Sequence, residues 1–258
     1  VPINVAPPID ETDSMALMRK SYQATEMTPI AHFNNDKWRQ MRWGYYQLIE
    51  RSDREIGKVL DALKASGLAE NTLVIFTADH GDCTGAHSFA QKTVFYDESA
   101  RIPLILSYPG KIAPSANRKL VNVGVDTFPT MLDFAGLKIP SSFKGRSLKS
   151  VCENPNVKDW RKYVVVSNHM IQGAVPVGGT EIPESRGRML RTDNYKYAVY
   201  DLGEHRESLV DMENDPHEMR NVARNPEHKV ALETHRRLLR DYADKTGDTE
   251  AIEIMGNR

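Results

Sequence analysis

Two residues that can bind a metal ion, Asp79 and His80, directly follow an apolar segment of this chain, and Lys92 follows shortly after them. The segment, residues 73–76, is β-branched and bounded by turn residues, which predicts a buried strand in a parallel sheet. Open α/β sheets place ligand sites where their strands end. Asp supplies an anionic oxygen and His a neutral imidazole nitrogen. With the nearby lysine, this pattern predicts a cation site that binds a tetrahedral oxyanion.

A structural interpretation of the same residues remains open at this point. Asp79 and His80 could form a solvated turn with an N-capping Asp, and an isolated lysine is usually a surface residue. The strand before the pair and Lys92 after it favour a site. A lysine ammonium suits sulfate or phosphate because it is a compact point charge with three donors.

Four further residues could do chemistry. His87, in Gly85-Ala86-His87, could support the site, contact a substrate or be a plain loop histidine. His169 and Arg188 lie at predicted strand ends, where they could meet an anionic substrate or serve structure alone. Cys83 could be a nucleophile, but no spacing supports that role, and we interpret it as a loop or semi-buried thiol.

The elements around Asp79 predict an α/β fold. Apolar residues recur every three or four positions from Trp38 to Leu63, which predicts a long helix with Asn35 as its N-cap and Gly67 as its C-cap. A second buried strand is expected within residues 103–109 and an amphipathic helix within 125–135. We assign residues 35–155 to this α/β core and expect 1–34 to be an irregular lead-in loop.

Residues 156–258 predict a C-terminal α+β subdomain. Short strands separated by turn signals indicate a small antiparallel sheet. They are expected at 163–166, 187–191, 195–200 and 208–211. A charged amphipathic helix at 226–245 follows them.

Composition excludes several function classes. The chain has 258 residues, a net charge of -1 and a pI near 6.8, which give no electrostatic reason to expect nucleic acid or an anionic membrane. No apolar run reaches the length of a membrane helix. Cys83 and Cys152 form no disulfide framework. The proline-rich start resembles a mid-chain loop, so we expect the later part of a longer protein.

The stretch from Thr72 to Gly110 resembles the second signature region of the sulfatases, in the alkaline-phosphatase-like superfamily. The resemblance rests on Asp79-His80-Gly81, the Gly-x-His ending at His87, Lys92, the aromatic-acidic residues 95–98 and the Arg-x-Pro-Leu at 101–104. Gly-Arg-Ser-Leu at 145–148, residues 191–197 and residues 209–218 are similar to later parts of the family. From about residue 36 the resemblance is nearly continuous.

This resemblance implies a fold and a chemistry. The fold would be a partial alkaline-phosphatase-like mixed sheet flanked by helices, plus the small C-terminal sheet with its helix. Asp79 and His80 would be two ligands of Ca²⁺, or Mg²⁺ in some members, and Lys92 would contact the sulfate. The family hydrolyses sulfate esters or sulfamates with a formylglycine made in a Cys/Ser-x-Pro/Ala-x-Arg motif, and its members are usually periplasmic, secreted or lysosomal.

The chain departs from the family because it contains no such motif. We therefore expect the formylglycine and the remaining metal ligands in an N-terminal half of the same protein, and expect this chain to be inactive alone. The expected substrate is a sulfated carbohydrate or another sulfate ester, and the expected location is periplasmic or secreted. The alternatives are a phosphonate or phosphate monoester hydrolase of the same superfamily, and a non-catalytic fragment that binds sulfated glycan.

Overall fold

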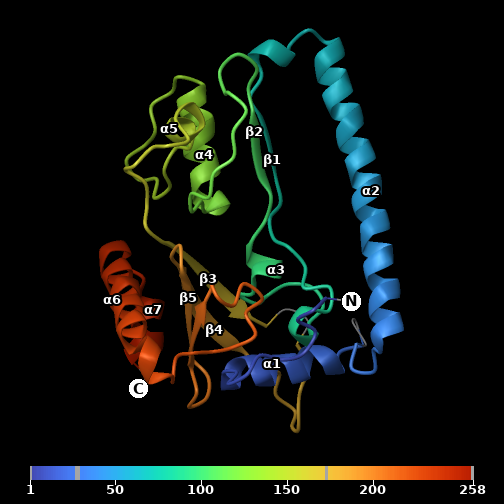
Figure 1. The fold of residues 1–258 in the computed structure, drawn as a ribbon, viewed down its shortest axis with the longest axis vertical. Helices are drawn as coiled ribbons and strands as arrows, with labels where there is room; N and C mark the ends of the chain where they lie inside the picture. Colours follow the sequence, from blue (N-terminus) through green and yellow to red (C-terminus); the bar gives the residue numbers. More distant parts are fainter. Residues whose placement is uncertain (1, 27–29, 172–173, 257–258) are drawn as a thin grey trace. The chain divides into compact units, whose positions relative to one another are not determined.

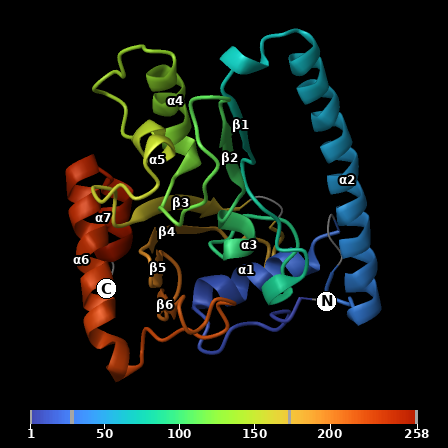
Figure 2. The ribbon, with the colours of Figure 1, turned by 45° about the horizontal axis from the view of Figure 1, so that its top comes forward.

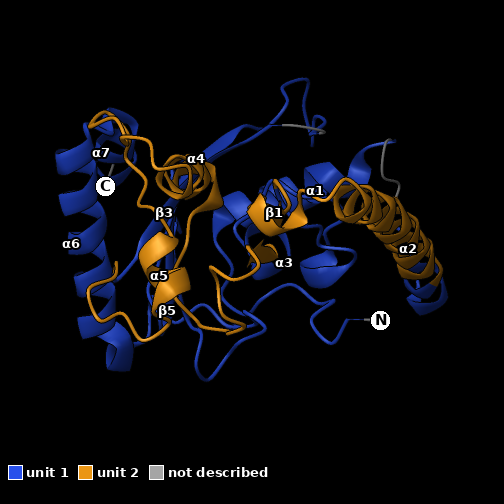
Figure 3. Cartoon of the chain, turned by 90° about the horizontal axis from the view of Figure 1, so that it is seen from above, with its two compact units in different colours: residues 1–39, 80–101, 162–258 blue, residues 40–79, 102–161 orange. Residues whose placement is uncertain are grey.

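The computed structural model describes residues 2–26, 30–171 and 174–256. Two compact units divide the chain (Figure 3). Unit 1 consists of residues 1–39, 80–101 and 162–258, and unit 2 of residues 40–79 and 102–161. Unit 1 thus combines three separate stretches, and residues 80–101 belong to the same unit as the C-terminal strands.

Unit 1 is built on a four-stranded antiparallel sheet with the strand order β3-β4-β5-β6, of which Figure 1 labels β3, β4 and β5. Its strands are β3 (Val164–Met170), β4 (Ser185–Arg191), β5 (Tyr195–Tyr200) and β6 (Glu207–Asp211). Asn168 pairs with Gly187 and His169 with Arg186. Successive side chains of a strand point to opposite faces, so Asn168 and His169 serve different layers of unit 1.

Each face of this sheet carries its own apolar core. The helices α6 (Lys229–Thr246) and α7 (Thr249–Gly256) lie on one side of the strands (Figure 2), where Leu190, Leu209 and Leu239 are fully buried. The other face packs against α1 (Asp13–Ala24) and residues 80–101, which include a 3-10 turn (Ala86–Ser88) and α3 (Asp97–Ala100). A further 3-10 turn (Pro226–His228) leads into α6. The loop that carries His87 and Lys92 thus packs against one face of a sheet that is covered on both faces.

Unit 2 contains a strand pair, the helices α4 (Val123–Phe134) and α5 (Lys149–Glu153) and most of a longer helix described below. The strands β1 (Val74–Thr77) and β2 (Leu104–Ser107) run antiparallel, and a 3-10 turn (Ala69–Asn71) precedes β1. Leu148, Val151 and Trp160 form a small buried cluster, and Asp126, fully buried, receives two hydrogen bonds from Arg161.

The long helix expected from the sequence is α2 (Asn35–Ala65), which begins in unit 1 and continues through unit 2. Its apolar periodicity does not translate into burial here, because Trp38 is the buried residue of this helix. Trp43 is 65% exposed, Leu48 60% and Val59 68%. The described residues therefore leave most of the apolar face of α2 uncovered.

Three expectations need correction. The lead-in at 1–34 is not irregular throughout, because Met15, Met18 and Tyr22 follow a helical spacing and pack into the core as α1. The first expected strand pairs antiparallel with the second rather than in a parallel sheet, and neither strand is buried, since Phe76 is 38% and Ile105 59% exposed. An apolar run specifies neither the direction of pairing nor what covers the strand. The helix α7 after the expected closing helix was not predicted.

Other predictions from the sequence are confirmed. The helix at 125–135, the closing helix and the short C-terminal strands all form, and β5 has the predicted bounds. The two units, by contrast, do not follow the expected bounds of 35–155 and 156–258, because unit 1 combines residues 1–39 and 80–101 with 162–258 and unit 2 holds residues 40–79 and 102–161. Apart from these predictions, the search for membrane spans among the described residues found no helix that is both long and apolar enough to cross a bilayer.

Candidate functional site

Asp79 and His80 follow the end of β1, as the sequence predicts. Asp79 is exposed and is the last residue of its stretch of unit 2, and His80 opens a stretch of unit 1. The His80 ring lies between two groups, with Nδ1 2.8 Å from the Gly81 carbonyl oxygen and Nε2 2.7 Å from Lys92 Nζ. A carbonyl only accepts, so we assign the ring proton to Nδ1 and a lone pair to Nε2.

The glycine after His80 is required by a close backbone approach. A Cβ at Gly81 would lie 2.0 Å from the Glu98 carbonyl oxygen. Because this oxygen belongs to the backbone, it cannot move aside as the end of a flexible side chain could. The Gly81 N–H also donates to the Ser99 carbonyl oxygen at 2.8 Å. The Asp-His-Gly order thus packs the His80 loop directly against the helix α3.

Lys92 is reached through a tightly bonded loop. Asp82 Oδ1 accepts the backbone N–H groups of Thr84 at 2.8 Å and of Gln91 at 3.2 Å. Cys83 is fully buried, and burial raises the pKa of its thiol well above the ordinary value. A thiol held protonated inside the core is a poor nucleophile, which supports the interpretation of Cys83 as a structural residue.

His87 is fully buried and not on the surface of the site. Its ring stacks on Tyr96 with centroids 3.7 Å apart, and Nε2 lies 3.2 Å from Asn4 Nδ2 and 3.7 Å from Glu98 Oε2. Burial raises the pKa of Glu98, but the nearby His87 and the hydrogen bond from Asn4 outweigh it and hold the pKa at about 2. This buried environment argues against a substrate contact for His87 and favours a supporting role within the loop.

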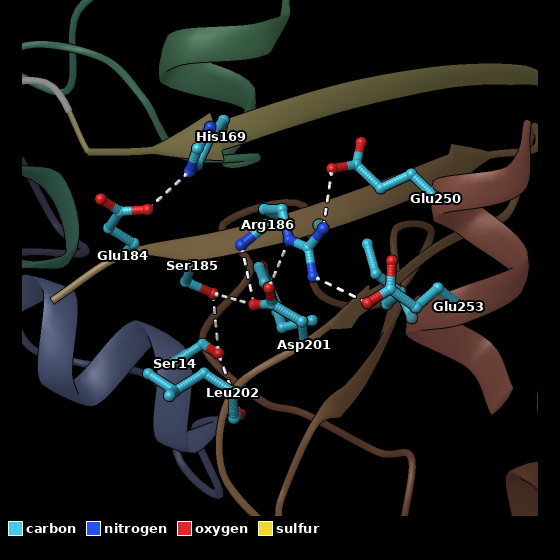
Figure 4. A network of polar contacts seen from close by, with 12 residues as sticks. Ser14, His169, Glu184, Ser185, Arg186, Asp201, Leu202, Glu250 and Glu253 are labelled. Atoms are coloured by element: carbon cyan, nitrogen blue, oxygen red, sulfur yellow. Dashed lines mark hydrogen bonds and ion pairs between the residues drawn. The ribbon is translucent and has the colours of Figure 1, made fainter. Parts of the chain in front are cut away.

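His169 and Arg188 lie on the opposite face of the sheet from the Lys92 loop, on the side of α6 and α7. His169 forms an ion pair with Glu184 at 3.3 Å, and both side chains are about half exposed (Figure 4). Arg188 is buried and its guanidinium binds Asp248 and Glu250. The structure therefore does not bring these two residues together with His80 and Lys92.

Figure 4 shows how the neighbouring Arg186 ties several elements together. Its guanidinium binds Asp201 at 2.7 Å and reaches Glu250 and Glu253 of α7 at 3.3 Å each. Asp201 in turn accepts a hydrogen bond from Ser185, which bonds to Ser14 of α1. This network holds α7 to the strands, and it is structural in character.

The sequence analysis missed a buried charged cluster beneath the loop. Lys196, 3% exposed on β5, bonds to the Phe95 carbonyl oxygen and forms ion pairs with Asp97 and Glu218. Glu218 also accepts the Asp97 N–H at 2.6 Å. Burial raises the pKa of Glu218, and Lys196 opposes that rise. The sequence did contain a signal for this cluster, because the two-residue repeat of β5 places Lys196 on the same face as the core residues Ala198 and Tyr200.

The donor set does not complete a calcium site by itself. Among the described residues, no three His, Cys, Asp or Glu side chains converge as a metal centre would require. His80 nevertheless has the arrangement of a metal-binding histidine, in which one nitrogen donates to a carbonyl and the other keeps its lone pair. Asp79 and His80 would contribute two donors, whereas Ca²⁺ takes six to eight ligands.

Comparison with known families gives two matches. The family model described as N-sulphoglucosamine sulphohydrolase, C-terminal, matches residues 85–244, and the model described as Sulfatase matches residues 11–137. Together they include His80, His87 and Lys92.

Comparison with individual proteins agrees. The chain is similar to a Delta 4,5-hexuronate-2-O-sulfatase of Bacteroides thetaiotaomicron, at 32% identity over 86% of this chain and 45% of that protein. A solved 2-O GAG sulfatase matches with a TM-score of 0.82 and 29% identity, over 96% of this chain and 52% of that one. The phosphonate monoester hydrolase of Agrobacterium radiobacter, with a TM-score of 0.74, 20% identity and coverage of 93% and 51%, shares the fold. The chain thus spans about half the length of these proteins.

Proposed function

This chain belongs to the sulfatase family, and we propose that it forms the C-terminal part of an enzyme that hydrolyses sulfate esters of a saccharide. Its α/β fold is that of the alkaline-phosphatase-like superfamily, as the sequence predicts. The observation that carries the proposal is the contact of Lys92 with His80 directly after β1; the family model described as Sulfatase covers both residues, and the C-terminal model covers Lys92. The 2-O-sulfatase relatives support a sulfated glycan as substrate.

In this proposal Lys92 binds the sulfate group, and Asp79 and His80 are two ligands of a Ca²⁺ or Mg²⁺ ion. The metal would supply Lewis acidity and neutralise negative charge. The single lone pair of His80 Nε2 now accepts from Lys92, so a metal ligated there and the ammonium compete for it. Metal ligation by His80 would leave the three N–H donors of Lys92 to hold sulfate oxygens.

The nucleophile would come from an N-terminal part of the same protein. Support comes from the absence of a Cys/Ser-x-Pro/Ala-x-Arg motif in this chain and from its share of the relatives' length. Exposed apolar side chains of unit 2, such as Trp43 at 65% and Ile105 at 59%, are consistent with a protein surface that covers them. The isolated chain should then turn over no 4-nitrophenyl sulfate, and turnover by it would contradict this part.

The cellular location of the protein is the next part of the proposal. We expect a periplasmic or secreted protein, by analogy with the family. Cell fractionation followed by mass spectrometry of tryptic peptides from residues 35–101 tests it, and recovery with the cytoplasmic fraction would contradict it.

The role of Lys92 can be tested in the complete protein with 4-nitrophenyl sulfate and sulfated disaccharides. Lys92→Ala should lower kcat/KM by about a hundredfold or more, because a preorganised charge at the reacting group is lost. The matched control is Lys20→Ala, which removes an exposed lysine from α1. Unchanged turnover by Lys92→Ala would refute the role. Faster cleavage of a phenyl phosphonate monoester than of any sulfate ester would favour the phosphonate hydrolase alternative.

A further inference from the structure

Lys92 lies between two residues with unusual backbone conformations. Gln91 has φ +66° and Thr93 has φ +84°, and neither is glycine. Positive φ is uncommon for any L-residue and is an outlier for a β-branched one. Such conformations persist where surrounding contacts enforce them, and they concentrate at functional sites. The contacts that hold the two flanking residues therefore indicate what fixes the root of the Lys92 side chain.

The residue before Lys92 is held by its own loop. The Gln91 N–H donates to Asp82 Oδ1 at 3.2 Å, and its carbonyl oxygen accepts the Cys83 N–H at 2.8 Å. Since Cys83 is fully buried, this side of Lys92 is anchored in the core. These contacts connect Lys92 back to the segment that follows His80.

The residue after Lys92 is held from two other elements. Asn168 Nδ2 of β3 donates to the Thr93 carbonyl oxygen at 2.6 Å, and the Thr93 hydroxyl donates to Tyr22 Oη of α1 at 2.8 Å. Tyr22 is 6% exposed and packs edge-on against Phe89. The backbone of Thr93 is thus clamped between the sheet and α1.

Asn168 lies on the face of β3 that makes this contact possible. The pleat of β3 directs it to the face of Met170 and the Lys92 loop, whereas the neighbouring residues Ser167 and His169 point to the other face. The Thr93 carbonyl oxygen can only accept, so the Asn168 group facing it at 2.6 Å is the amide nitrogen. An aspartate at 168 would keep the size and lose this donor.

We propose that Asn168 is a positioning residue for Lys92, because it holds the Thr93 carbonyl and so fixes the direction in which the Lys92 side chain leaves the backbone. This inference rests on the proposed role of Lys92 in sulfate binding. A lysine carries its charge on a flexible four-carbon stem, so the orientation of its root limits where the ammonium can reach. Catalytic groups require support of this kind to stay in productive geometry.

The test compares Asn168→Asp and Asn168→Ala with Ser167→Asp and Ser167→Ala in the complete protein, using 4-nitrophenyl sulfate. Ser167 is the matched control because it is exposed and lies one residue away on the opposite face. Both Asn168 variants should lower kcat/KM by about tenfold or more, since small misplacements of a catalytic group are costly. The Ser167 variants should match the wild type.

A double variant separates positioning from a general structural role. If Asn168 acts through Lys92, Asn168→Asp should cause no further loss in a Lys92→Ala background, measured as residual turnover in long incubations. Losses that multiply would overturn the inference, as would Asn168 variants that behave like the Ser167 controls while Lys92→Ala is inactive. Full activity of Lys92→Ala would instead refute the proposed function on which the inference rests.

Discussion

The last helix, α7, should depend on a buried ion pair for its attachment to the sheet. Arg188 is 6% exposed, and its Nε and one terminal nitrogen each donate to Asp248 at 2.8 Å, while the same terminal nitrogen also binds Glu250 at 2.6 Å. Asp248 Oδ1 additionally accepts the Ala251 N–H in the first turn of α7. Asp248→Asn keeps the shape and the capping oxygen, and it removes the charge together with the oxygen that accepts from Arg188 Nε.

The size of the effect follows from burial. The buried Arg188 guanidinium cannot be rehydrated when the Asp248 charge is lost. The upper limit for the lost stability is therefore that of a broken buried ion pair, roughly 3–5 kcal/mol. Glu250 remains as a partner but is 41% exposed, which limits how much it compensates. We expect about 2 kcal/mol, the range for hydrogen bonds to charged groups. The opening of α7 should then be about thirtyfold more frequent.

Hydrogen exchange with mass spectrometry of peptides from α7 measures this opening locally. Asp248→Asn should speed exchange in α7 and leave the strands β5 and β6 unchanged. The matched control, Asp244→Asn, alters an exposed carboxylate of α6 and should have no effect. Equal exchange of α7 in the wild type and in Asp248→Asn would refute the reasoning.

The same ion pair should make the attachment of α7 sensitive to acid. The hydrogen bond from Arg188 holds the pKa of Asp248 and that of Glu250 below their ordinary values. Because the folded pKa is the lower one, the stabilisation is complete above the unfolded pKa values near about 4 and is lost as the pH falls through the folded values. The difference between wild type and Asp248→Asn should therefore shrink below about pH 4.

Two further predictions concern the core and the site loop. Arg161→Met should lower the free energy of unfolding by about 3 kcal/mol, because it leaves the fully buried Asp126 without its counter-charge; an unchanged urea midpoint would contradict this. Gly81→Ala should disrupt the loop, since its Cβ would meet the Glu98 carbonyl oxygen at 2.0 Å. Near-ultraviolet circular dichroism and sulfatase turnover check it against Gly57→Ala, where a Cβ meets nothing within 4 Å.

Periodicity allowed much of the fold to be predicted. Turn signals around a short run of strand-forming residues gave the bounds of β5, and the three- and four-residue spacing gave α2. The same signal was too short to identify α7, and it did not identify α1, whose Met15 and Met18 pack against distant parts of unit 1. Direction of pairing also lay beyond it, because β1 and β2 are far apart in the sequence.

For the candidate site, the sequence by itself determined the local part. Asp79, His80 and Gly81 follow a strand in fixed order, and Lys92 lies one short loop away, so their proximity needs few long-range contacts. The family resemblance drew on the same local motifs. Their chemistry could therefore be inferred before any coordinates.

Only the tertiary structure decided which residues support that loop. Asn168 reaches Thr93 across 75 positions of sequence, while His169, its neighbour, points to the opposite face of the same strand. For Arg188 the sequence left a substrate contact and a structural role open, and the structure binds it to the carboxylates of Asp248 and Glu250 at the start of α7. The physical reason is that a residue type fixes what a side chain can bond, whereas sheet register and burial decide which partner lies within reach.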